Sequence, residues 1–328
     1  HCAGTYITTR ITSGDAPVLQ SAETMDIDGN GKIDHYKLTF DVPVNDVSFP
    51  GHAGNNALGT ATTQWLIAGR SNVRIDTRDA APPTGPGDNV TNDNVIYLAF
   101  DESVNACSGN DISGCDSGAK PDITTTATPG LSDFDPTNFP QLASGGVVET
   151  DKAPATLITL KGHGNATSLV AYFSEAVFTS TGGTGNLTAA DFTYQNDNAG
   201  GATAIAGLSE ANGGDGKVTL TTTGSFALAD DNVDDLVAAT NAIYDAGDNA
   251  LVATAAVRVV PLLLSAETMD INSDGVIDHY KLTFSMAVDD STFPGHTANG
   301  LGTATTDWLV ENQGNIRLDT RTAAAPNG

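Results

Sequence analysis

The stretch MDIDGNGKIDHYKLTF occupies residues 25–40, and a near copy, MDINSDGVIDHYKLTF, occupies residues 269–284. Between residues 21–40 and residues 265–284 the two copies share 16 of 20 residues. Each copy joins a cluster of acidic and amide side chains to the run HYKLTF, in which polar and apolar residues alternate. Such alternation is typical of a β-strand with one buried face. The repeat therefore predicts a unit, a polar loop followed by a strand, that the chain uses twice.

Strand-like segments recur along the whole chain. Runs rich in Val, Ile, Thr, Tyr and Phe, such as NVIYLAF at 94–100 and KVTLTT at 217–222, alternate with clusters of Gly, Asn, Asp and Pro. This pattern is typical of strands separated by turns. No segment sustains the apolar period of 3.6 residues that marks an amphipathic helix. The sequence therefore predicts an all-β protein.

The repeat also divides the chain. The two copies continue to match through FPGH, LGTATT, a tryptophan and DTR, whereas APATLITL at 153–160 is a diverged relative of APVLQSAE at 16–23. We predict four segments: residues 1–14 as the trailing strand of a preceding domain or a donor strand, 15–152 as a domain with the polar loop, 153–260 as a domain without it, and 261–328 as an incomplete repeat of the first.

The two ends leave two interpretations open. A chain that begins with a lone strand and ends within a repeat is either a piece of a longer tandem array or a unit that assembles head to tail by strand addition. We favour the first interpretation because it is simpler.

Three motifs in the middle segment resemble the bacterial Ig-like domains of S-layer and other cell-surface proteins. They are FSEAV at 173–177, LTAADF at 187–192 and IYDAGDNAL at 243–251. The resemblance covers about residues 153–260, and the outer copies match only in their first two strands. It implies tandem Ig-like β-sandwich domains at the cell surface and a structural role, not a reaction. Strands at short regular spacing with turn signals between them agree with a sandwich.

The polar loop has the spacing of a calcium-binding loop. Oxygen-bearing side chains stand at Asp26, Asp28, Asn30 and Asp34, which are positions 1, 3, 5 and 9, and Lys32 would supply its backbone carbonyl at position 7. Ca²⁺ binds six to eight oxygens at about 2.3–2.6 Å, so alternate residues of a tight loop can share one ion. The second copy keeps the pattern with Asp270, Asn272, Asp274, the Val276 carbonyl and Asp278.

The loop departs from the EF-hand at one position. Position 12 is Lys37 in the first copy and Lys281 in the second, so the usual bidentate Glu is missing. We expect a carboxylate from elsewhere to complete each site, and Glu23 and Glu267 are the candidates nearest in sequence. The alternative is a polar turn in which Asp and Asn bind their own backbone. We favour calcium because the loop changes between copies yet keeps an oxygen at every ligand position.

The net charge of the chain limits the kinds of molecule that it could bind. The 328 residues carry 40 Asp and Glu against 14 Lys and Arg, for a formal net charge of −26. Without a basic patch, the chain is a poor ligand for nucleic acid or an anionic membrane, and no apolar run reaches the roughly 18 residues that span a bilayer. The excess of carboxylates instead favours divalent cations as binding partners.

The three cysteines suggest one local crosslink. Cys107 and Cys115 bracket the short polar loop SGNDISG, which could close as a disulfide, and Cys2 is then left over. Three free thiols are the alternative.

Catalytic interpretations lack a supporting motif. The six histidines form no HExxH or H-x-H pattern. The acidic pairs at 230–231 and 234–235 are interpreted as a short helix or loop with a solvated acidic face, not as glycosidase carboxylates. YDAGDNAL at 244–251 is interpreted as a turn in preference to a weak cation site. The sequence therefore predicts no enzymatic activity.

Aromatic residues and sequons bear on recognition of sugars. Trp65 and Trp308 occupy equivalent positions in the two copies, and we interpret both as core residues; an exposed tryptophan would instead stack on a sugar. The sequons at Asn89, Asn165 and Asn186 are candidate glycan sites.

Together these features predict a non-enzymatic extracellular protein. We expect a calcium-stabilised array that self-associates into an S-layer, a surface filament or a biofilm matrix. The alternative is a cell-surface adhesin or a set of carbohydrate-binding modules within a larger secreted protein.

Overall fold

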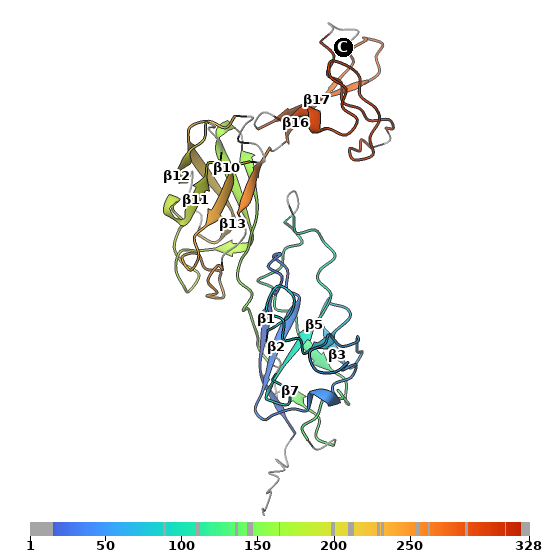
Figure 1. Ribbon diagram of the computed structural model, residues 1–328, viewed down its shortest axis with the longest axis vertical. Helices are drawn as coiled ribbons and strands as arrows, with labels where there is room; N and C mark the ends of the chain where they lie inside the picture. Colours follow the sequence, from blue (N-terminus) through green and yellow to red (C-terminus); the bar gives the residue numbers. More distant parts are fainter. Residues whose placement is uncertain are drawn as a thin grey trace, which may run out of the picture.

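The computed structural model describes residues 16–87, 90–108, 112–134, 137–142, 147–163, 165–197, 201–208, 213–227, 230, 233–252, 256–261, 263–285, 288–311 and 313–322. The predicted all-β class is confirmed, because the described chain is built from several β-sheets (Figure 1). Short 3-10 helices also occur in the described part of the chain, among them η1 (Asp46–Ser48), η2 (Ala189–Asp191) and η4 (Asp290–Thr292).

We call residues 16–151 the N-terminal module. Its main sheet has the order β4-β5-β2-β1-β7, with β8 also paired to β1, and β3 pairs with β6 in a smaller sheet. The strands are β1 (Val18–Met25), β2 (His35–Phe40), β3 (Trp65–Ile67), β4 (Arg74–Asp76), β5 (Val95–Ala99), β6 (Ile123–Thr125), β7 (Gln141–Leu142) and β8 (Glu149–Thr150).

The alternation in HYKLTF sets the burial of β2. Tyr36, Leu38 and Phe40 point into the core and are almost fully buried. Trp65 is also buried, donates its indole N–H to the Pro129 carbonyl at 3.0 Å, and is therefore a core residue, as predicted. Its burial leaves no face for stacking on a sugar. The core prediction is wrong for the equivalent Trp308, which is 36% exposed and contacts the Phe293 ring.

The middle module comprises residues 153–260. Its seven strands follow the order β11-β14-β15-β9-β10-β13-β12, and the two ends of this path, β11 and β12, lie near each other, so the sheet bends around one core. The strands are β9 (Leu157–His163), β10 (Asn165–Val177), β11 (Phe192–Gln195), β12 (Ala204–Leu208), β13 (Asp215–Thr223), β14 (Asp235–Ala238) and β15 (Val257–Val260).

The C-terminal module, residues 263–322, repeats the first hairpin. β16 (Leu263–Met269) pairs with β17 (His279–Phe284) in the register of β1 and β2, including an irregularity at the equivalent place. Burial differs sharply, because Tyr280 is 45% exposed where Tyr36 is fully buried. In β2, Tyr36 lies between β1 and β5, whereas β17 pairs only with β16 among the described residues.

One acidic segment differs from its predicted environment. The expectation of a solvated face around residues 230–235 is wrong for Asp230 and Asp234, which are fully buried. Asp234 accepts a hydrogen bond from the Tyr194 hydroxyl at 2.6 Å, and Asp230 accepts one from the Ala227 N–H at 2.7 Å. Hydrogen bonds from the protein therefore take the place of water at Asp234 and at Oδ2 of Asp230, whereas Oδ1 of Asp230 has no partner among the described residues.

Several predictions fall outside the described residues: the trailing strand at 1–14, Cys2, the sequon at Asn89 and Asp231. No helix in the described part of the chain has both the length and the apolar character required to cross a membrane.

Asp46 offers a test of the N-terminal core. It is 4% exposed, and its Oδ1 has no hydrogen-bond partner among the described residues. Burial raises the pKa of Asp46 to about 6. Because this folded pKa exceeds the unfolded one, the charged carboxylate destabilises the fold above pH 6, and the cost fades as pH falls from about 6 to 4.

We therefore expect Asp46→Asn to stabilise the module at pH 7 by about 1–2 kcal/mol and to flatten its stability between pH 4 and 7. Calorimetric melting across that pH range measures both effects. Asp79→Asn, at an exposed position, should change little at any pH. A loss of stability in Asp46→Asn at pH 7 would show that the carboxylate has a favourable partner.

Candidate metal centre

The polar loop between β1 and β2 is wound by the carboxylate of Asp26. Its Oδ1 accepts the Gly29 N–H at 2.8 Å, and its Oδ2 accepts the Gly31 N–H at 2.8 Å. Gly31 has a φ of +88°, a conformation that a residue with a side chain adopts at a cost. Asp34 fixes the far end, because its Oδ1 accepts the Ile27 N–H at 3.0 Å. These are the bonds of a polar turn, and they also point the loop's oxygens inward.

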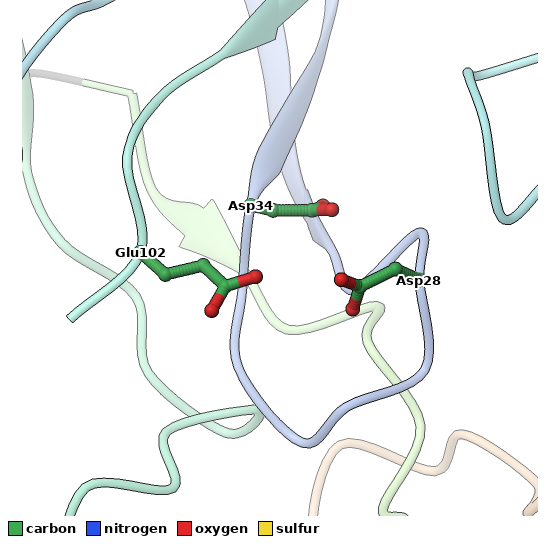
Figure 2. Close-up of side chains that lie close together, drawn as sticks. All are labelled: Asp28, Asp34 and Glu102. Carbon is green, nitrogen blue, oxygen red and sulfur yellow. The ribbon is translucent and has the colours of Figure 1, made fainter. Parts of the chain in front are cut away.

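A third carboxylate joins two of the predicted ligands. The side chains of Asp28, Asp34 and Glu102 each place a carboxylate oxygen within 4.8 Å of the others (Figure 2). The side-chain nitrogen of Asn30 donates to both Glu102 (2.8 Å) and Asp28 (3.0 Å), so Asn30 lies inside the same group. We call Asp28, Asn30, Asp34 and Glu102 the loop cluster. Its three carboxylates present oxygen, the donor that Ca²⁺ and Mg²⁺ prefer, whereas Asn30 turns its nitrogen to them and its Oδ1 accepts the Lys32 N–H at 3.0 Å.

Glu102 is the residue that sequence reasoning missed. It follows the end of β5, more than 70 residues from the loop, and reaches it because β5 pairs with β2. The candidate nearest in sequence, Glu23, instead lies opposite Lys37 on the β1–β2 hairpin. The sequence signal that could have found it is the antiparallel pairing of NVIYLAF with HYKLTF. This pairing brings Glu102, which follows NVIYLAF, next to the polar loop, which precedes HYKLTF.

The other predicted ligands have different surroundings. Asp26 is turned toward backbone N–H groups and is not part of the loop cluster. Burial raises the pKa of Asp26 to about 7; Asp34 and Asp28 add to the rise, and the Gly31 N–H opposes it. Lys32 donates its ammonium to the Ser103 carbonyl at 2.9 Å, and its own carbonyl accepts no hydrogen bond from the described residues.

His35 positions one of the loop carboxylates. Its ring is 5% exposed and lies between Asp34, at 2.8 Å, and Asp76, at 3.0 Å. Burial lowers the pKa of His35, but its bonds to the two carboxylates outweigh that effect and raise it above the ordinary value. Arg78 also binds Asp76. This network holds Asp34 at the loop.

A disulfide-bonded segment supports the loop from outside. Cys107 and Cys115 form the predicted disulfide, with sulfurs 2.02 Å apart. The Gly31 carbonyl accepts the N–H groups of Asp116 (3.0 Å) and Ser117 (3.1 Å), and the Asp116 side chain accepts the Ile33 N–H. The loop is therefore bound to residues 116–117 along one side.

The loop of the second copy is held by equivalent hydrogen bonds, but it lacks a counterpart of Glu102 among the described residues. Asp270 accepts the Gly275 N–H at 2.8 Å, Asp278 accepts the Ile271 N–H at 3.0 Å, and His279 lies between Asp278 and Asp319. Asn272 and Asp274 exchange hydrogen bonds with each other, and the Val276 N–H donates to Asp274. Among the described residues, no third acidic side chain joins this loop as Glu102 joins the first.

Comparison of the chain with protein-family models, with curated proteins and with solved structures found no match.

Gly31 and Gly275 occupy equivalent positions in the two loops, so comparing them measures how much the packing around the first loop contributes to its stability. A Cβ at Gly31 would lie 2.6 Å from Ile158 Cδ1, 2.9 Å from Cys107 Sγ and 2.9 Å from Ser174 Cβ. At Gly275, with a φ of +86°, a Cβ would meet nothing within 4 Å. The first loop is therefore packed against both the disulfide and the middle module.

We expect Gly275→Ala to cost only the left-handed backbone strain, about 1–2 kcal/mol. Gly31→Ala should lose about 1–3 kcal/mol more, because its methyl group collides with packed neighbours. Scanning calorimetry of the two full-length variants measures the difference. Equal losses would contradict the packing of the first loop against the middle module.

Proposed function

We propose that this chain is a non-enzymatic extracellular structural protein, a tandem array of Ig-like β-sandwiches whose polar loops bind Ca²⁺. One observation carries the proposal. A loop with calcium-ligand spacing, present twice in the sequence, is joined in its first copy by Glu102, which supplies the carboxylate that the loop itself lacks.

The charges of the loop cluster favour a divalent cation. Asp28, Asp34 and Glu102 bring three carboxylates together, and the nearest ammonium, on Lys32, is 3.8 Å from Glu102. Lys32, together with His35, which is shared between Asp34 and Asp76, does not balance the three carboxylates, so a bound Ca²⁺ would relieve their repulsion. The oxygen-only ligand set excludes a preference for softer metals.

Calcium binding would stabilise the folded chain. A ligand that binds the folded chain and not the unfolded one stabilises it by RT ln(1 + [Ca²⁺]/Kd), about 2.7 kcal/mol at a hundredfold excess over Kd. The loop cluster also connects β1, β2 and the segment after β5, so occupancy would fasten three parts of the N-terminal sheet. A strongly acidic chain outside the cell, where Ca²⁺ is abundant, would fold and associate under these conditions.

Glu102→Gln tests the site against the candidate that the sequence favoured. Removing this carboxylate should weaken calcium binding about tenfold or more, because affinity depends on the charge and number of ligands. Glu23→Gln makes the same chemical change away from the loop cluster and should leave affinity unchanged. Isothermal titration with CaCl₂ after chelator treatment reports both. Equal affinity in Glu102→Gln and the unmodified chain would contradict the assignment of Glu102.

Assembly is tested separately from binding. In millimolar CaCl₂ we expect the protein to form ordered sheets or filaments, and we expect chelation to disperse them, because the carboxylates would then repel one another. Electron microscopy of one preparation before and after chelation makes the comparison. Particles that stay dispersed at all calcium concentrations would refute self-association while leaving the binding result intact.

A further inference from the structure

A second group of buried carboxylates lies between the N-terminal and middle modules. Asp151 follows β8, Glu175 lies in β10, and Asp245 lies in the turn before the last strand of the middle module. Each contributes a carboxylate oxygen, and these oxygens all lie within 4.8 Å of one another. We call these three residues the junction cluster; none of them belongs to the loop cluster.

Two oxygens of the junction cluster lack hydrogen-bond partners. Asp151 is 8% exposed; its Oδ1 accepts the Ala153 N–H at 3.1 Å, whereas its Oδ2 accepts no hydrogen bond from the described residues. Glu175 accepts the Ser117 hydroxyl at Oε1, at 2.6 Å, and its Oε2 likewise has no partner there. Of these two residues Asp151 is nine-tenths buried and Glu175 is partly buried. A carboxylate oxygen withdrawn from water without a donor is costly unless something else binds it.

Both of these oxygens face the same place, beside two glycines. A Cβ at Gly118 would lie 2.5 Å from Glu175 Oε2 and 3.7 Å from Asp151 Oδ2. A Cβ at Gly247 would lie 3.1 Å from Asp151 Oδ2. Neither glycine has a left-handed φ, so the backbone does not require glycine at either position. The two glycines instead let the carboxylates of Glu175 and Asp151 approach the backbone, because a side chain at either position would collide with them.

No ion pair neutralises this group, although the charge of Lys120 opposes the rise in the pKa of Asp151. Among the described residues, no Lys, Arg or His forms an ion pair with Asp151, Glu175 or Asp245. Burial raises the pKa of Glu175 to about 8, and Asp151 and Asp245 add to the rise against the Ser117 hydrogen bond. Burial and Asp245 likewise raise the pKa of Asp151 to about 6. Burial and the neighbouring carboxylates therefore both disfavour the charged forms of Asp151 and Glu175.

We propose that Asp151, Glu175 and Asp245 bind a divalent cation, Ca²⁺ by their all-oxygen chemistry, at the junction of the two modules. Oxygens that share one Ca²⁺ lie at most about 5 Å apart, twice the bond length, and the cluster meets this limit. Asn249 holds Asp245 in place by donating its backbone and side-chain N–H groups at 2.9 and 2.8 Å. The predicted turn is thus present, and it positions a ligand.

The site would join the two modules through one ion. Asp151 is bound to Thr24 of β1 in the N-terminal module, and Ser117 connects the disulfide-bonded segment to Ser174 and Glu175 of β10. Glu175 and Asp245 belong to the middle module. Occupancy of this site does not depend on calcium binding at the loop cluster.

The test uses the full chain, stripped with a chelator and titrated with CaCl₂ by calorimetry. Glu102→Gln should lose the loop component and keep the junction component, Glu175→Gln should do the reverse, and the double variant should lose both. We expect each single variant to lose about one equivalent of Ca²⁺ per chain or to bind it more than tenfold more weakly. Asp248→Asn, an exposed neighbour in the turn of Asp245, should bind as the unmodified chain does.

Melting temperatures give an independent readout. With chelator, Glu175→Gln should melt above the unmodified chain because like-charge repulsion is relieved; with CaCl₂ the order should reverse. Gly118→Ala retains all three charges but displaces Glu175, and it should lose the same junction component if Glu175→Gln does not fold. Unchanged stoichiometry in both variants, or a melting order that is the same with and without calcium, would overturn the proposal. Loss confined to Glu102→Gln would overturn it while leaving the loop site intact.

Discussion

The hydrogen bonds from the Gly29 and Gly31 N–H groups to Asp26 wind the loop on which the rest of the N-terminal module depends. That winding directs the Gly31 carbonyl toward residues 116–117 and sets the direction in which β2 leaves the loop. β2 then pairs with β5, and the segment after β5 returns Glu102 to the loop. A turn of nine residues thus determines both the sheet order and the position of the acidic side chains.

The few basic residues divide the carboxylates of this chain into two kinds. Asp76 is bound by Arg78 and His35, and Asp116 by Arg70, so these carboxylates have bases beside them. The loop cluster has Lys32 beside Glu102 and His35 beside Asp34 for its three carboxylates, and the junction cluster forms no ion pair among the described residues. With 14 bases for 40 acids, the chain cannot neutralise every group internally. The two clusters of three carboxylates, in which acids outnumber the bases beside them, are those we assign to cations.

Much of the fold was accessible from the sequence because burial follows local periodicity. The alternation in HYKLTF predicted the inward side chains of β2, and Trp65 and the Cys107–Cys115 disulfide were also predicted correctly. The position of Glu102 was not accessible, because it depends on which strands pair. The burial of Asp234 was missed for a related reason, since its partner Tyr194 lies 40 residues away. Local patterns report which face of a strand is buried, and not which distant side chain meets it.

The connection between the two modules is short. Only residues 151–156 separate the end of β8 from the start of β9, and six residues reach at most about 20 Å when fully extended. Such a tether keeps the facing surfaces at a high effective concentration even when their contacts break. A bend that parts Ser117 from Ser174 is therefore followed by reclosure within the same molecule, so an array of such modules would yield to a transient load and recover its shape.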